Sequence, residues 1–173
     1  MDTTKAAWVI DTSSLIALHR RSNIPTDKQK KIFESLSKLV EEERLFYPRQ
    51  IVKELERQEG KEDIVYLWAK KNEAKACANT PSLDSPYIHK VVNHPQASAV
   101  IDTEKVTGAD EADPYLLGMA LELRDSKKFR LVTVITQETR DLTTKLSLNS
   151  ACGLLELISL PIVPFLKQQS LLS

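Results

Sequence analysis

Short apolar segments alternate along this chain with longer amphipathic ones, and this alternation restricts the fold more than any other feature of the sequence. Strands separated by helices require crossover connections, which place the strands parallel to one another and the helices on both faces of the sheet. The sequence therefore predicts an α/β protein, a three-layer α/β/α sandwich with a central, mainly parallel sheet. The predicted strands are residues 7–11, 44–48, 130–136 and 161–165.

Apolar residues at helical spacing predict the helices that connect these strands. After the second strand, Ile51, Val52 and Leu55 form the apolar side of one such helix. The segment 78–95 contains three prolines and is predicted to be the least regular part of the chain. Residues 96–106 suit a helix less well because several of them are β-branched. The remaining predicted helices are residues 14–21, 26–44, 62–77, 112–123 and 149–157, followed by a last helical segment.

The composition is that of an ordinary globular protein. The chain has 173 residues, 42% of them hydrophobic, so a single domain over residues 1–173 can bury its own core. Twenty-four Lys and Arg balance 24 Asp and Glu, so no overall charge favours nucleic acid or a membrane, although a local basic groove fits this balance. No apolar stretch is long enough to span a membrane, and no export signal is present. We therefore expect a cytoplasmic protein without a membrane partner.

The patterns of cysteine, histidine and glycine exclude several kinds of site. Cys77 and Cys152 form no CxxC pair and are expected to be buried thiols. His19, His89 and His94 show no HExxH spacing, so a zinc site is not expected. With four glycines the chain contains neither GxGxxG nor GxxxxGK[ST], which excludes a glycine-rich phosphate loop.

Acidic residues follow the predicted strands or begin the helices after them. In a parallel sheet the carboxyl ends of the strands meet at one edge, where ligands of such folds bind. Oxygen ligands are what Mg²⁺ prefers, and without a cation several carboxylates packed together would repel one another. A magnesium site at this edge is therefore one interpretation of the pattern. The acids that belong to it are Asp11, Glu54, Asp110, Asp113, Glu138 and Asp141.

Each acid also has an ordinary structural interpretation. Asp11 precedes Thr-Ser-Ser and suits a helix cap as well as a ligand. Asp113 precedes Pro114, a favoured start of a helix. Glu54, taken alone, is a solvated helix residue, and Glu138 and Asp141 are ordinary loop acids. The order and context of the whole set carry the functional interpretation.

Four segments in this order resemble the PIN-domain nucleases, especially the VapC-like toxin branch and a group of uncharacterised single-domain PIN proteins. They are "VIDTSSLI", "YPRQIVKELE", "ADEADPYLLGMA" and "LVTVITQE", and "SLNSACGLLEL" with "PIVPF" is similar to the family's closing helix and strand. The resemblance implies an α/β fold, an acid cluster that binds Mg²⁺ or Mn²⁺, and cleavage of RNA. It also implies, for toxins, a cognate antitoxin that blocks the site.

Carried over to this chain, the resemblance assigns Asp11, Glu54 and Asp113 as metal ligands, and Thr136 as the hydroxyl that orients the site. Many members have Asp two residues after this threonine, where the present chain has Glu138. The fourth acid is therefore either Glu138 or Asp141.

Two further acids near these positions keep alternative assignments. Asp110 either supports the ligands or is an exposed acid of the loop. Glu56 competes with Glu54 for the place on the helix after the second strand but lies on a different helical face.

The resulting hypothesis is a Mg²⁺- or Mn²⁺-dependent endoribonuclease, the toxin of a toxin-antitoxin pair, with RNA as substrate. The amphipathic helix 26–44 offers a homodimer surface, or its apolar stripe is simply core. One alternative is a PIN-like module that binds RNA or acts as a scaffold without cutting. Another is a small phosphotransfer domain, which is disfavoured because the strand 130–136 lacks the expected lysine. Basic residues that flank the acids and are candidates for RNA contact are Arg20, Arg21, Arg49, Lys53, Lys127, Lys128 and Arg130.

Overall fold

A computed structural model describes residues 5–21, 23–102 and 111–173 and contains a central four-stranded sheet. The strands are β1 (Ala6–Ile10), β2 (Leu45–Phe46), β3 (Leu131–Ile135) and β4 (Ile158–Leu160). They lie in the order β2-β1-β3-β4 and every neighbouring pair is parallel. The predicted parallel α/β architecture is therefore confirmed.

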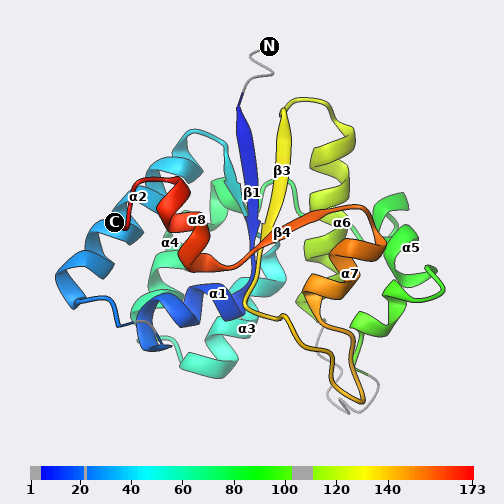
Figure 1. Ribbon diagram of the computed structural model, residues 1–173, viewed down its shortest axis with the longest axis horizontal. Helices are drawn as coiled ribbons and strands as arrows, with labels where there is room; N and C mark the ends of the chain where they lie inside the picture. Colours follow the sequence, from blue (N-terminus) through cyan, green and yellow to red (C-terminus); the bar gives the residue numbers. More distant parts are fainter. Residues whose placement is uncertain (1–4, 22, 103–110) are drawn as a thin grey trace.

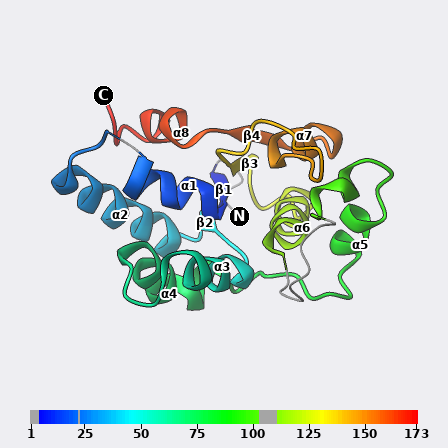
Figure 2. The ribbon, with the colours of Figure 1, turned by 90° about the horizontal axis from the view of Figure 1, so that it is seen from below.

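Helices cover both faces of this sheet, which makes the molecule a three-layer α/β/α sandwich (Figure 1). Viewed along the strands, α1, α2, α4 and α8 lie on one side and α5, α6 and α7 on the other (Figure 2). The helices are α1 (Thr12–Ile16), α2 (Thr26–Glu41), α3 (Arg49–Glu59), α4 (Ile64–Ala76), α5 (Pro86–Val92), α6 (Ala112–Asp125), α7 (Leu148–Leu154) and α8 (Ile162–Gln168). Two shorter segments are a π-helical turn, η1 (Ala17–Arg21), and a 3₁₀ turn, η2 (Ala97–Val100).

The two central strands are buried because both of their faces are covered. Ala7, Val9 and Ile10 of β1 are fully buried, as are Val134 and Ile135 of β3. Strands covered on both sides read as continuous apolar runs, which is why these segments are recognisable in the sequence.

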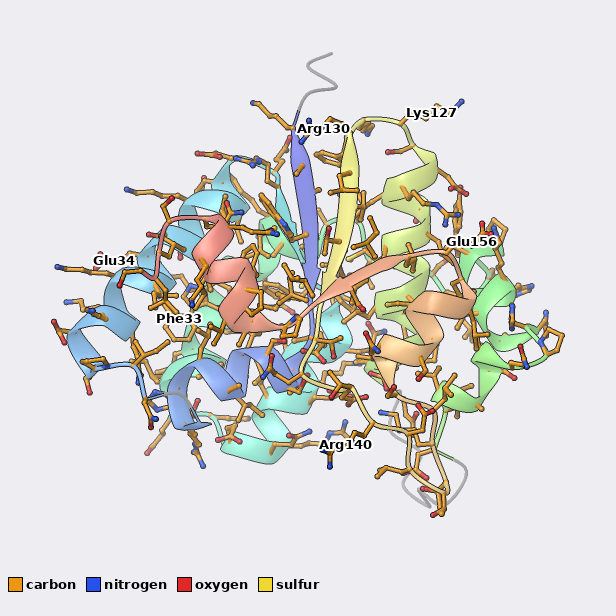
Figure 3. The ribbon with its side chains drawn as sticks, in the orientation of Figure 1. Phe33, Glu34, Lys127, Arg130, Arg140 and Glu156 are labelled. Carbon is orange, nitrogen blue, oxygen red and sulfur yellow. The ribbon has the colours of Figure 1, made fainter. Side chains whose placement is uncertain are left out.

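The apolar residues of α2 belong to this core. Phe33 is buried and its ring contacts that of Trp68, whereas the neighbouring Glu34 points outward (Figure 3). Of the two interpretations of this helix, the structure therefore shows the core stripe.

The predicted strand at 161–165 is wrong. The fourth strand is Ile158–Leu160, and residues 162–168 form α8, with Pro161 at its N-cap. Pro161 and Pro164 have no backbone N–H to give to a sheet, but proline is compatible with the first turn of a helix. Ile162, Phe165 and Leu166 are buried at helical spacing.

The middle of the chain also differs from its prediction. The segment 78–95 contains the helix α5, which Ser85 caps by accepting a hydrogen bond from the Tyr87 amide. The predicted helix 96–106 is reduced to the turn Ala97–Val100, and its last four residues lie outside the described part of the chain. In the described residues, no helix is long and apolar enough to cross a membrane.

The carboxyl ends of β1 and β3 lie side by side, at the edge seen in Figure 2. The Asp11 amide, just beyond β1, donates to the Ile135 carbonyl at the end of β3 over 3.1 Å. The chain segments that follow both strands therefore begin at the same place.

Candidate functional site

A cavity of about 150 Å³ opens at this carboxyl edge, and its lining is mostly polar. Its walls come from α1, α3, the start of α6 and the loop between β3 and α7. The lining residues are Thr12, Ser13, Ile16, Glu54, Gln58, Glu111, Asp113, Glu138 and Lys145.

Asp11 lies behind this cavity and is 2% exposed. One carboxylate oxygen caps α1 by accepting from the Ser14 amide over 2.8 Å. The other accepts from the hydroxyls of Thr136 (2.6 Å) and Ser13 (2.7 Å). Burial raises the pKa of Asp11, and the hydrogen bonds from Thr136 and Ser13 partly offset that effect. The carboxylate thus caps a helix and orders two hydroxyls at once.

Thr136 joins two of the predicted site residues. Its hydroxyl donates to Asp11 and accepts from the Glu138 amide over 3.0 Å. Thr136 is 1% exposed, so these two hydrogen bonds are shielded from water. They position the backbone of Glu138 directly after β3.

Glu54 points into the cavity from α3. Its two oxygens accept from the Thr12 hydroxyl (2.6 Å) and from the Ala112 amide at the start of α6 (3.2 Å). Glu56, two residues later, instead pairs with Lys61 at 3.3 Å and accepts from Tyr66 at 3.5 Å. The two glutamates therefore point away from each other, as an offset of two residues on a helix requires.

Asp113 and Glu138 share one cation, the ammonium of Lys145. Lys145 Nζ lies 2.5 Å from Asp113 Oδ2 and 3.3 Å from Glu138 Oε2. The pKa of Asp113 is raised to about 7, by burial above all and also by Glu138 and Glu54, although Lys145 opposes the rise. Burial disfavours the charge of Lys145, but the carboxylates of Asp113 and Glu138 raise its pKa above the ordinary value.

Lys145 was not among the residues that the sequence singled out. It lies seven residues after Glu138 in a loop without periodicity, and no local pattern indicates that it turns back to α6. Thr12 was visible as part of the hydroxyl run after the first strand, and the cavity also includes Glu111, whose carboxylate accepts from the Asp102 amide.

One of the predicted acids, Asp141, does not line the cavity. Asp141 is exposed and accepts from the Ser147 amide over 2.9 Å, and this hydrogen bond lowers its pKa. Asp110 lies outside the described residues.

The sequence matches the family described as "Domain of unknown function (DUF4411)" over residues 8–171. The chain belongs to this family. No curated protein and no solved structure matches it. The match runs from β1 through α8, so every residue that lines the cavity lies inside the DUF4411 domain.

The oxygen atoms that line the cavity of the DUF4411 domain are of the types that a hard divalent cation prefers as ligands. Carboxylate and hydroxyl oxygens surround the cavity, and the acids already attract one positive charge, that of Lys145. Among the residues that the structure describes, no three His, Cys, Asp or Glu side chains are arranged as a ready metal site. Lys145 holds the position between Asp113 and Glu138 instead.

Three of the seven basic residues considered for RNA contact lie away from the cavity. Lys127 and Arg130 precede β3 and therefore lie at the opposite edge of the sheet, together with Lys128 (Figure 3). Arg20 pairs with Glu59 (2.5 Å) and Asp63 (3.3 Å).

Two of the candidate basic residues share a helix with a residue that lines the cavity. Arg49 and Lys53 are exposed on α3, the helix that carries Glu54. Arg140, which the sequence did not single out, lies on the same side of the molecule as the cavity (Figure 3). The side chain of Arg21 lies outside the described part of the structure.

Proposed function

We propose that this DUF4411 domain is a Mg²⁺- or Mn²⁺-dependent endoribonuclease of the PIN type. One observation carries the proposal: Glu54, Asp113 and Glu138 come from three separate regions of the chain and line one cavity at the carboxyl edge of a parallel sheet. Three acids that meet at one cavity, two of them around a buried ammonium, favour a site that attracts a cation.

The side chains divide into ligands and groups that orient them. Asp113 and Glu138 would hold the cation from α6 and from the loop after β3, and Glu54 completes the acidic wall from α3. Asp11 and Thr136 fix the ends of β1 and β3 from which this wall is built. A bound divalent cation would polarise the phosphodiester and activate water for its hydrolysis.

The resemblance to VapC-like toxins extends the proposal to partners. RNA is the proposed substrate, and an antitoxin that covers the cavity is the proposed inhibitor. Arg49 and Lys53, exposed on α3, are the proposed contacts for RNA phosphates near Glu54. A homodimer is compatible with this role, but it would not use the apolar face of α2, which lies in the core.

The test is cleavage of a mixed RNA pool by the purified chain with Mg²⁺, with Mn²⁺ and with EDTA. Asp113→Asn removes a charge from the cavity and is expected to lower the cleavage rate about 100-fold or more. Glu54→Gln should also lower it, whereas Glu56→Gln, two residues away and paired with Lys61, should leave it unchanged.

Cleavage that survives Asp113→Asn or EDTA would contradict the proposal. A folded protein that binds RNA but cleaves none under any of these conditions would instead support a binding or scaffold module.

A further inference from the structure

The ammonium of Lys145 is held between two carboxylates that come from different elements. Asp113 belongs to α6 and Glu138 to the loop after β3, and Lys145 Nζ lies 2.5 Å from the first and 3.3–3.4 Å from both oxygens of the second. The side chains of Lys145 and Asp113 are only 14% and 11% exposed. This is the environment of a site cation and not of a solvated surface charge.

Other lysine pairs of the described structure show the contrast. Lys70 pairs with Glu73 at the same 2.5 Å distance, but both belong to one helix and Lys70 is 54% exposed. Lys61, 75% exposed, pairs with Glu56 alone. Such exposed pairs contribute little to stability, whereas Lys145 balances the charge of Asp113, which water cannot reach freely, although Glu138 is 34% exposed.

The backbone of Lys145 is fixed while its charge is carried on a flexible stem. Its amide and carbonyl exchange hydrogen bonds with Leu142, and the next amide, Leu146, donates to the Ala99 carbonyl over 2.7 Å. Four methylene groups separate this anchored backbone from the ammonium. The charge can therefore change position without rearrangement of the loop.

A second cavity provides the place to which it can move. This cavity has a volume of about 300 Å³ and shares two lining residues, Glu138 and Lys145, with the acidic cavity, so these residues lie at the partition between the two cavities. Its other walls include Thr139, Arg140 and Ser147. Rotation of the stem would carry the ammonium across this partition, next to a second cation, Arg140.

We propose that Lys145 is a built-in exchangeable cation. In the metal-free protein its ammonium occupies the position of the divalent cation between Asp113 and Glu138. When the divalent cation binds, the ammonium is displaced into the second cavity, where together with Arg140 it binds a phosphate of the RNA strand. This inference rests on the proposed nuclease function. It adds that Lys145 and the divalent cation compete for the position between Asp113 and Glu138.

The test is the affinity of the full chain for Mn²⁺, measured by titration calorimetry. Lys145→Met keeps an unbranched apolar side chain and removes the competing charge. The matched control, Lys70→Met, removes a lysine from an ion pair of the same length on an exposed helix face. We expect Lys145→Met to bind Mn²⁺ about tenfold more tightly than the wild type, and Lys70→Met to bind with unchanged affinity.

Two further measurements test whether the variant remains folded and whether Lys145 contacts a phosphate. The melting temperature should rise more on addition of Mn²⁺ for Lys145→Met than for the wild type, because tighter binding stabilises the folded state more. At saturating Mn²⁺, RNA cleavage by Lys145→Met should fall about tenfold, since the phosphate contact is lost.

The outcomes separate the two proposals. Mn²⁺ binding by the wild type with equal or weaker binding by folded Lys145→Met overturns the exchange and leaves the nuclease proposal intact. Tighter binding with an unchanged cleavage rate overturns the phosphate contact. Absence of Mn²⁺ binding by the wild type and by every variant overturns the nuclease proposal and the exchange with it.

Discussion

Asp113 is 8% exposed at the start of α6, and three charged groups act on its carboxyl. Burial is the main cause that raises its pKa and Lys145 lowers it, Glu138 and Glu54 also raise it, and the net result is a pKa of about 7. The folded protein therefore retains a proton on Asp113 at pH values where the unfolded chain has already released it.

This difference makes stability depend on pH. Because the pKa rises from 3.8 in the unfolded chain to about 7 in the folded protein, the contribution of Asp113 is fully present below pH 3.8 and is lost as pH rises through 7. We expect the free energy of unfolding to fall by about 1.4 kcal/mol per pH unit from this group within that window. Asp113→Asn should remove this contribution to the slope of the unfolding free energy against pH. Urea unfolding at several pH values measures that slope.

Asp141→Asn provides the control for this measurement. The pKa of Asp141 is lowered by its hydrogen bond with the Ser147 amide, so its contribution is lost only as pH falls below 3.8. The variant should keep the wild-type slope between pH 4 and 7. Equal slopes for the wild type and Asp113→Asn would show that Asp113 is ionised throughout this window.

At the scale of residues, the sequence identified the site residues that come directly after a buried strand. Asp11, Thr136 and Glu138 could be collected because an apolar run ends immediately before each or close to it. Lys145 could not, because its role depends on the path of an irregular loop that brings it back to α6. Short-range pattern carries no information about such a return.

At the scale of elements, buried strands and amphipathic helices were predictable, and the proline-rich segments were not. The pair Ser85 and Pro86 is a start signal for α5, but three prolines in the surrounding segment made it resemble a loop. Around 161–165, apolar residues suit either a strand or a helix, and the tertiary contact of Phe165 with Trp8 accompanies the helix. For segments with such a short apolar pattern, tertiary packing determines whether a helix or a strand forms.

The end of α3 gives a prediction at this scale. Gly60 has φ 91° and ψ 163° where it terminates the helix, a conformation that is essentially restricted to glycine. We expect Gly60→Ala to lower the free energy of unfolding by about 1–3 kcal/mol, measured by urea unfolding. Gly153→Ala, in α7 with nothing within 4 Å of the added carbon, should instead raise it by about 0.5–1 kcal/mol. Equal effects of the two substitutions would contradict the role of Gly60.

At the scale of the whole molecule, one apolar cluster joins the two helical layers. Cys77, at the end of α4, and Cys152, in α7, are both buried in this cluster although α4 and α7 lie on opposite sides of the sheet (Figure 2). Burial raises the pKa of each thiol to about 12, so neither forms a thiolate readily in the folded state. The two thiols therefore report opening of the two layers.

We expect the two layers to open together. The variants Cys77→Ala and Cys152→Ala each retain one buried thiol. A thiol-specific reagent should react with this thiol only after the protein unfolds. The free energy of the opening that exposes the thiol should therefore be the same in both variants. The rate of thiol modification in increasing urea measures this value. Clearly different protection of the two thiols would show that the layers unfold separately, against the expectation of a single domain.

The pairing of β1 with β3 also sets the moment at which the site can first exist during synthesis. Residues 6–10 pair with residues 131–135, and Lys145 follows only after that. While residues 55–137 are being translated, the nascent chain therefore carries Asp11 and Glu54 without Glu138 to complete the cavity. If the domain cuts RNA, the ribosome that makes it is exposed to no complete site until Glu138 and Lys145 have been translated.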